Sequence, residues 1–474
     1  MSKNSMLSPL SRLAAMVLKA ALPAAAIVAA AGFAPALLAQ TPAVPPAATP
    51  AEAQAQDEPE LVEFETAKLR RIAVPAFVAP SPADTPAGNS TNLGRQIAEV
   101  IASDMRASGL FEPAGPSGLR AITLGEVTAP QYDFWKGRGV DQLIEGFIRV
   151  GADGNLTIGC YLYDVTFAGE ITRLGFVVTP GEWRRAAHKC ADAFYSRVTG
   201  EKPFFDSRIA YIAESGPKGN RIKRLAIMDS DGANHKFITS GQATALTPRY
   251  SPNYRSILYL SYTDGNPRIY VYDVDSGRQR LITQSRNPTF APRWSPDGKT
   301  ILYSMAIAGN SDIYKISVNG GEPVRLTSAP GIDVGGSFSP DGTQIVFESD
   351  RSGSQQIYIM NADGSNPRRI SFQGGRFATP EWSPRGDLIA VTRIAGDFRV
   401  GTMRPDGSNL RLLTDSWQDE APTWAPNGRV IQFFRTAKNS GKTGIWQVDL
   451  TGRNERQLPT PVDGSDPAWG PVLP

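Results

Sequence analysis

Short runs of alternating apolar and polar residues, separated by turn residues, fill the chain from about residue 208 to its end. The stretch PRWSPDGK at 292–299 shows the unit that recurs, an aromatic residue followed by a Ser-Pro-Asp-Gly turn. The proline inside this turn has counterparts along the chain at Pro252, Pro296, Pro340, Pro384, Pro426 and Pro471. Their intervals of 44, 44, 44, 42 and 45 residues indicate an array of one supersecondary unit.

Each unit divides into four short strands. In the copy just quoted, the expected strands are 291–295, 300–306, 312–318 and 323–327. The turn at 296–298 combines a proline, which fixes φ, with a glycine, which accepts positive φ. Four antiparallel strands per period are typical of a propeller blade, so six copies predict a six-bladed β-propeller. A helical repeat array is the alternative, and the β-branched runs and frequent turns argue against it.

The two ends of the array are out of phase. The first copy, at 208–239, has only the second, third and fourth strands of a blade, and the last copy, at 466–471, is a first strand alone. We therefore expect the C-terminal strand to complete the first blade. This closure would leave the ring without an open edge.

The first sixty residues do not look like part of a folded core. Basic residues precede an apolar, alanine-rich stretch at 20–39: Lys3, Arg12 and Lys19. This pattern predicts a cleaved export signal over 1–39, and Pro23 and Pro35 argue against the alternative of a membrane anchor. Residues 40–60 are rich in Ala, Pro, Gln and Glu and are expected to form a disordered tether. The mature protein should be exported and soluble.

A mixed helix and strand pattern between 61 and 200 predicts a small N-terminal α/β domain, followed by the propeller over 201–474. Residues 61–66 alternate apolar and acidic side chains, as an edge strand or a strand offered to a partner would. The other elements expected are strands at 69–77, 141–150, 156–165 and 171–179 and helices at 92–108, 132–135 and 183–198.

Two cysteines fall on different elements of this domain. Cys160 lies on an expected strand and Cys190 on an expected helix. An exported compartment permits a disulfide between them, whereas two buried free thiols are the alternative.

The sequence offers little catalytic chemistry. A net charge of +3 gives no basic footprint for nucleic acid. His188 and His235 are the two histidines, and neither accompanies a GxSxG elbow or a separate hydrolase region. No glycine-rich loop suited to a phosphate follows a strand into a helix. We expect no enzyme activity and no cofactor.

Three turns carry Asp and Asn at spacings that suggest calcium, at 229–234, 361–366 and 404–409. A calcium loop would need a distal carboxylate, which none of them has, so we interpret them as Asx and glycine turns and expect no metal. The recurrent tryptophans are interpreted as packing between blades: Trp294, Trp382, Trp424 and Trp469.

Binding of a protein partner is the remaining mode. The loops that link the fourth strand of one blade to the first strand of the next differ most between copies, and they combine aromatic and charged residues that suit a partner surface. Local loop packing is the alternative for each residue. The candidates are Arg286, Pro288, Thr289, Phe290, Ala291, Ile332, Asp333, Val334, Arg376, Phe377, Trp417 and Asp419.

Several segments give the chain a family resemblance. The repeats, RIAVPAF at 71–77, GVDQLIEGFI at 139–148 and AHKCADAFYSRVTG at 187–200 resemble the TolB family, periplasmic propeller proteins of the Tol–Pal system in Gram-negative bacteria. The resemblance implies a periplasmic location, binding of the lipoprotein Pal on the propeller, and a role in outer-membrane integrity and in drawing the outer membrane inward during division. It also implies a TolA-binding strand at the mature N-terminus: Leu61, Val62, Glu63, Phe64, Glu65 and Thr66.

These observations together predict a non-enzymatic periplasmic adaptor that is monomeric, is not stably inserted in a membrane and binds Pal and TolA, with other Tol-system or outer-membrane proteins as further partners. The competing hypothesis is a propeller hydrolase or lyase. It would require an acid/base cluster in the channel.

Overall fold

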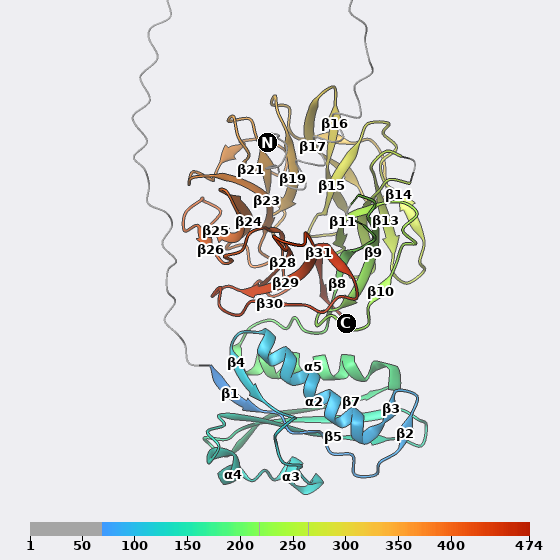
Figure 1. Ribbon diagram of the computed structural model, residues 1–474, viewed down its shortest axis with the longest axis vertical. Coiled ribbons are helices and arrows are strands. Elements are labelled where there is room, and N and C mark those ends of the chain that lie inside the picture. Colours follow the sequence, from blue (N-terminus) through green and yellow to red (C-terminus); the bar gives the residue numbers. More distant parts are fainter. Residues whose placement is uncertain (1–68, 218, 264) are drawn as a thin grey trace, which may run out of the picture.

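The computed structural model describes residues 69–474 except 218 and 264. A small domain of helices and one sheet lies at one end of a larger ring of sheets (Figure 1). The predicted signal at 1–39, the tether at 40–60 and the strand at 61–66 lie outside the described residues. Within the described part, none of the helices combines the length and the apolar character needed to cross a membrane.

The N-terminal domain is built on a five-stranded sheet in the order β4-β1-β5-β6-β7. Strand β1 (Arg70–Ala73) runs parallel to β4 (Phe111–Ala114) and to β5 (Gln142–Val150). The strands β6 (Leu156–Asp164) and β7 (Gly169–Val178) continue the sheet in antiparallel fashion. The strand predicted over 69–77 is shorter than expected, because only residues 70–73 form ladder pairs and Pro75 has no amide hydrogen to donate.

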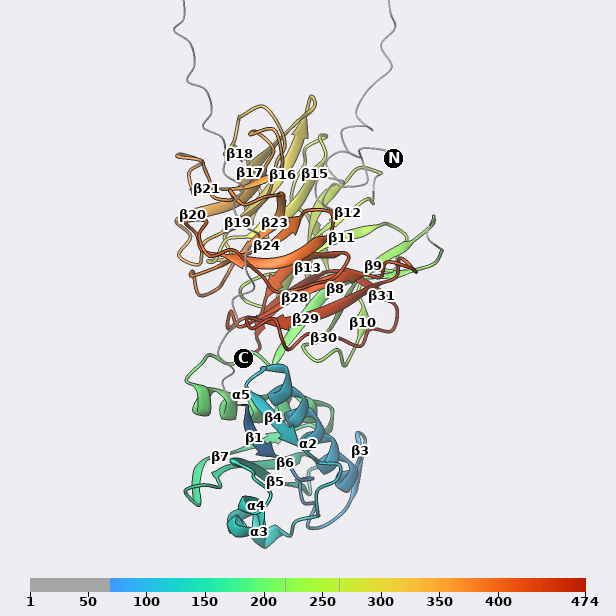
Figure 2. The ribbon, with the colours of Figure 1, turned by 60° about the vertical axis from the view of Figure 1, so that its left-hand side comes forward.

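Two long helices cover one face of this sheet (Figure 2). Helix α2 (Ser90–Ala107) starts at Asn89, whose side chain accepts a hydrogen bond from the Thr91 amide, and it buries Leu93, Ile97 and Ile101. Helix α5 (Trp183–Thr199) ends at Gly200, which takes the left-handed conformation common after helices. Both long helices and the short helix α4 (Tyr132–Lys136) confirm the sequence pattern.

Several small elements of the domain were not anticipated. They are the strand β4, the hairpin of β2 (Asp84–Thr85) and β3 (Gly88–Asn89), the helix α3 (Leu124–Thr128) and the 3-10 turn η2 (Pro180–Glu182). Each is too short to carry a hydrophobic period.

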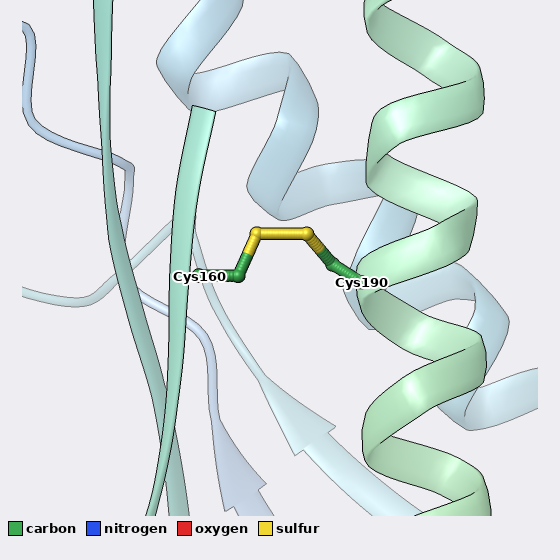
Figure 3. Close-up of a disulfide and its surroundings, with 2 residues drawn as sticks. All are labelled: Cys160 and Cys190. Carbon is green, nitrogen blue, oxygen red and sulfur yellow. A yellow bond between two sulfur atoms is a disulfide. The ribbon is translucent and has the colours of Figure 1, made fainter. Parts of the chain in front are cut away.

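A disulfide joins the sheet to the helix layer. Cys160 on β6 and Cys190 on α5 are bonded through their sulfur atoms, and both residues are fully buried (Figure 3). The pair links elements 30 residues apart in the sequence.

The ring consists of six four-stranded antiparallel sheets, which confirms the predicted six-bladed propeller. Blade 1 contains β31 (Asp463–Val472), β8 (Ser207–Ser215), β9 (Ile222–Asp229) and β10 (Lys236–Phe237). Blade 2 contains β11 (Ala245–Tyr250), β12 (Ser256–Ser261), β13 (Arg268–Asp273) and β14 (Gln279–Leu281). Blade 3 contains β15 (Thr289–Trp294), β16 (Thr300–Ile307), β17 (Asn310–Ser317) and β18 (Val324–Arg325).

The second half of the ring repeats this plan. Blade 4 contains β19 (Asp333–Phe338), β20 (Gln344–Ser349), β21 (Gln356–Asn361) and β22 (Arg368–Arg369). Blade 5 contains β23 (Arg376–Trp382), β24 (Ile389–Ile394), β25 (Phe398–Met403) and β26 (Arg411–Leu412). Blade 6 contains β27 (Asp419–Trp424), β28 (Val430–Thr436), β29 (Thr443–Asp449) and β30 (Arg456–Gln457).

The C-terminal strand closes the ring as predicted. Strand β31 pairs with β8 from Asp463 opposite Glu214 to Val472 opposite Ser207. The Trp469 indole also donates a hydrogen bond to the Ser207 hydroxyl over 2.8 Å. The last strand of the chain and the first strand of the ring are therefore held by both backbone and side-chain bonds.

The N-terminal domain rests on one face of the propeller. Asn427, in the turn between the first two strands of blade 6, donates to the Tyr195 hydroxyl over 3.2 Å. Asn454, between the third and fourth strands of the same blade, donates to the Arg106 carbonyl over 3.1 Å. Because successive strands alternate in direction, the loops from fourth to first strands and the turns from second to third strands lie on the opposite face. We call that opposite side the open face.

Candidate functional site on the open face of the propeller

The open face carries the residues that were proposed from sequence to contact a partner, but more than half of them are buried. The prediction of an exposed set is wrong for seven residues that are at most 5 % exposed: Thr289, Phe290, Ala291, Asp333, Val334, Phe377 and Asp419. Phe290 and Phe377 are fully buried and belong to the apolar layers between blades. Local packing, the alternative reading, therefore holds for these positions.

The burial follows from how each loop meets the ring. Residues at the start of the innermost strands are hydrogen-bonded to the preceding blade. The Thr289 amide donates to the Pro267 carbonyl over 3.1 Å, and the Phe377 amide donates to the Gln355 carbonyl over 3.0 Å. Side chains at these positions are consequently drawn into the seam between two blades.

The two buried aspartates of the set are held by arginines. The Arg351 guanidinium lies 2.7 Å from Asp333, and Arg435 contacts both oxygens of Asp419 at 2.6 and 2.8 Å. Burial raises the pKa of Asp419, and the hydrogen bonds from Arg435 oppose that rise. These pairs stiffen the rim of the open face, and their charges are already matched.

Arg376 is anchored in a second polar network at the seam between blades 4 and 5. It donates to the Gln355 side chain over 3.3 Å, and Gln355 in turn donates to the buried Glu348 carboxylate over 2.6 Å. The Thr379 amide donates to the other oxygen of Glu348. The Arg376 side chain is therefore half-buried and fixed in direction.

Trp417 is the most exposed aromatic residue of the predicted set. Its side chain is 46 % exposed, and the Lys438 ammonium lies 4.8 Å from the ring centre. Four more members of the set keep part of their surface in contact with solvent: Arg286, Pro288, Ile332 and Arg376. Phe372 was missed, although it is 64 % exposed and lies under the Arg369 guanidinium. The sequence does offer a signal for Phe372, because it is an apolar residue in the loop that follows the fourth strand of blade 4.

The channel on the side of the N-terminal domain contains a cavity of about 260 Å³. Its carboxylate, Glu381, lies 2.8 Å from the Arg293 guanidinium and also accepts hydrogen bonds from the Thr423 hydroxyl and the Trp424 amide. This carboxylate is thus engaged in holding neighbouring blades together. The residues that line this cavity include no histidine and, apart from Glu381, no carboxylate.

Two of the four tryptophans of the repeat form hydrogen bonds between blades, whereas the Trp382 and Trp469 indoles donate within their own blades. The Trp294 indole donates to the Arg249 carbonyl and the Trp424 indole to the Glu381 carbonyl, each in the preceding blade. Both histidines lie elsewhere. The His235 ring packs edge-on against Phe237, and the His188 ring contacts the Asp104 carboxylate.

Comparison with known proteins shows which protein family this chain resembles. Residues 62–171 match the model of the TolB amino-terminal domain and residues 195–473 that of the TolB beta propeller domain. The chain is similar to Tol-Pal system protein TolB 1 of Novosphingobium aromaticivorans, with 67 % identity over 85 % of this chain and 90 % of that protein. It is also 62 % identical to Tol-Pal system protein TolB of Sphingopyxis alaskensis, over 92 % of this chain and 97 % of the relative.

A solved structure shows the same two-part arrangement. The crystal structure of TolB from Acinetobacter baumannii superimposes with a TM-score of 0.76 at 27 % identity, over 85 % of this chain and 97 % of that one. The relatives are named as Tol-Pal system proteins, and membership of this non-enzymatic family confirms the expectation that the chain is not an enzyme. From the matched domains and these relatives together, we conclude that the chain belongs to the TolB family of Tol-Pal system proteins.

Proposed function

We propose that this protein is a periplasmic adaptor that binds the lipoprotein Pal on the open face of its propeller and TolA through residues 61–66. In this proposal, residues 1–39 direct export and are removed. The adaptor supports outer-membrane integrity and the inward movement of the outer membrane at division. Membership of the Tol-Pal system supports the general role, and the partners, location and division role are our inference.

The observation that carries the proposal is the exposed Trp417 on the face that the N-terminal domain leaves free. An aromatic side chain at a protein surface buries a large area when a partner covers it, and such residues are frequent interface hot spots. Lys438 beside the ring adds a charge that a partner carboxylate could meet. The rim pairs around Asp333 and Asp419 keep the surrounding loops in place, so little ordering would be needed on binding.

The TolA contact is proposed for a segment outside the described residues. Residues 61–66 alternate apolar and acidic side chains and directly precede the first strands of the N-terminal domain. An extended segment of this kind can be added as a strand to a partner sheet. Replacing Phe64 by Ala should weaken TolA binding while leaving Pal binding intact, as two separate calorimetric titrations would show.

Calorimetry with purified Pal tests the main proposal. We expect the wild-type protein to bind Pal and Trp417→Ala to weaken the affinity by about tenfold or more, since loss of a hot-spot aromatic typically costs over 1 kcal/mol. Phe167→Ala is the matched control, because Phe167 is 85 % exposed but lies in the N-terminal domain. Absence of Pal binding by the wild type would refute the proposal, and equal losses in both variants would refute the assignment to the open face.

A further inference from the structure

A cluster of metal-type donors lies where the N-terminal domain meets blade 1, away from the open face. His188 comes from α5, Asp229 is the last residue of β9, and Asp231 lies in the turn between β9 and β10. One side-chain atom of each lies within 4.8 Å of the others. The Nε2 atom of His188 lies 3.9 Å from an oxygen of Asp231 and has no hydrogen-bond partner, although the residue is only 2 % exposed.

The other ring nitrogen of His188 is held in the manner of a metal ligand. Its Nδ1 atom lies 2.7 Å from the carboxylate of Asp104, which comes from α2 and is also buried. Histidines that bind metals commonly donate their second N–H group to a carboxylate, which fixes the ring and its tautomer. With Nδ1 occupied in this way, the Nε2 lone pair points toward the two aspartates of the propeller.

The turn itself holds both carboxylates in place. The Ala233 amide donates to Asp231 over 3.0 Å, and the Asn234 side chain donates to Asp229 over 2.6 Å. Gly232 has a φ of 91°, and a Cβ added there would lie 2.8 Å from the Pro459 carbonyl, so the turn is fitted against the last blade. In the equivalent turns of blades 4 and 5, Asn361 and Arg404 take the place of Asp229.

Arg184 is the present neighbour of the two acids. Its guanidinium contacts Asp231 and lies 3.9 Å from Asp229, while 20 % of its side chain remains exposed. The His188 Nε2 atom is thus left without a partner, while one cation already lies beside both acids.

A divalent ion bound by these three residues would take the place that the Arg184 guanidinium now holds beside Asp231. The Arg184 side chain is 20 % exposed and lies over the Trp183 ring, 5.2 Å from its centre, so Arg184 and the ion would compete for the two carboxylates. The donor atoms need to draw closer, to the distances of about 2.0–2.2 Å that zinc makes with nitrogen and oxygen.

We propose that His188, Asp229 and Asp231 form a zinc site that fastens the N-terminal domain to the first blade of the propeller. An imidazole with two carboxylates suits Zn²⁺, whereas Ca²⁺ and Mg²⁺ prefer oxygen donors throughout. Water would complete the coordination. Because the ligands come from both domains, the bound ion would oppose their separation.

Titration calorimetry on the exported protein, stripped of metal by a chelator, tests the site. We expect one Zn²⁺ per chain and an affinity reduced by about tenfold or more in Asp229→Asn and in Asp231→Asn. The turn should accept the first change, since blade 4 has Asn361 at the equivalent position. Asp363→Asn is the matched control, because Asp363 occupies the position of Asp231 in a turn without a facing histidine, and its zinc affinity should equal that of the wild type.

The variant Arg184→Ala distinguishes a metal site from a domain contact that is held by ion pairs alone. Removing the competing cation should strengthen zinc binding, whereas an ionic junction would only lose a bond. Co²⁺ should give the visible absorption of a nitrogen- and oxygen-ligated ion, and that absorption should disappear in His188→Gln. The proposal is overturned if the wild type takes up no stoichiometric zinc, or if zinc binding is unchanged in both aspartate variants or weakened by Arg184→Ala.

Discussion

Glu145 is an ionisable residue that the fold buries away from water. It lies in the middle of β5, is fully buried, and neither carboxylate oxygen has a hydrogen-bond partner. Burial raises the pKa of Glu145 to about 8, the nearby Glu126 carboxylate adds to the rise, and Arg120 opposes it. The neutral acid is therefore the form that suits the folded protein at neutral pH.

This placement predicts an unusual dependence of stability on pH. Because the pKa of Glu145 in the folded state lies above the ordinary glutamate value of 4.5, the folded protein holds the proton more tightly than the unfolded chain. The stabilisation is complete below pH 4.5 and is lost as the pH rises toward 8. Glu145→Gln should remove this dependence and raise the free energy of unfolding at pH 8.5 by roughly 2 kcal/mol or more.

Urea unfolding at pH 5 and at pH 8.5 measures the effect. The control is Glu112→Gln, which removes a carboxylate whose side chain is 61 % exposed on β4 and should leave the pH dependence of the wild type unchanged. An identical loss of stability between the two pH values in wild type and Glu145→Gln would contradict the assignment.

The sequence predicted least well which individual loop residues are buried and which are exposed. Phe290 and Phe377 looked like surface anchors because they follow variable loops, yet both are buried by backbone bonds to the preceding blade. Trp417 stays exposed because it lies two residues before its strand begins, whereas Phe290 and Phe377 are the second residues of theirs. A local pattern cannot distinguish these positions, because the seam is formed by residues of two different blades, such as Thr289 and Pro267.

At the scale of elements, the disulfide makes a testable contribution to the N-terminal domain. It closes a loop of 30 residues between β6 and α5, and both cysteines lie inside the main apolar core (Figure 3). In the chain-entropy model, a crosslink over such a loop stabilises the folded state by about 3–4 kcal/mol. The double variant Cys160→Ala/Cys190→Ala should lose a comparable amount, as calorimetric melting would show.

The burial of both cysteines also predicts how the disulfide responds to a reductant. The wild type at room temperature should resist a mild reductant, since the bond is covered until the domain opens. Rapid reduction of the folded protein, or an unchanged melting temperature in the double variant, would argue against this account.

The blades were predictable from sequence because each copy repeats the same order of turns and strands, so a strand that is unclear in one copy is clear in another.

The bulge that all innermost strands share was not predictable. Each innermost strand has one residue at positive φ: Thr247, Ala291, Gly335, Thr379, Ala421 and Asp466. In all six strands the pairing register shifts near this residue. Residue types from Gly to Thr occupy the position, so no composition signal marks the bulge.

At the scale of the molecule, the junction of the two domains was beyond sequence reasoning. The sequence predicts no metal site at the turn 229–234, because the same segment contains no further donor. The donor that faces it, His188, comes from the other domain. The pattern of one segment therefore cannot reveal this cluster, because α5 and β9 belong to different domains.

The closing strand connects ring stability to that junction, because β31 and the residue after it contact the linker that joins the two domains. Trp469 bonds to Ser207 and packs against Phe204 in the linker, with ring centres 6.0 Å apart. The Leu473 amide donates to the Asp206 carbonyl over 2.7 Å. Removing β31 would therefore expose the long edge of β8 and release the linker at the same time (Figure 1).

Deletion of residues 463–474 should abolish the cooperative melting of the propeller and promote aggregation through the bare edge of β8. Trp469→Ala should cost about 3–5 kcal/mol, and Trp469→Phe, which keeps an aromatic ring but loses the bond to Ser207, about 1 kcal/mol. Trp417→Ala serves as the control, since its exposed ring contributes little to folding. A truncated chain that melts like the intact protein would mean that the ring does not depend on its last strand, and the fixed geometry on which the open face relies would lose its physical basis.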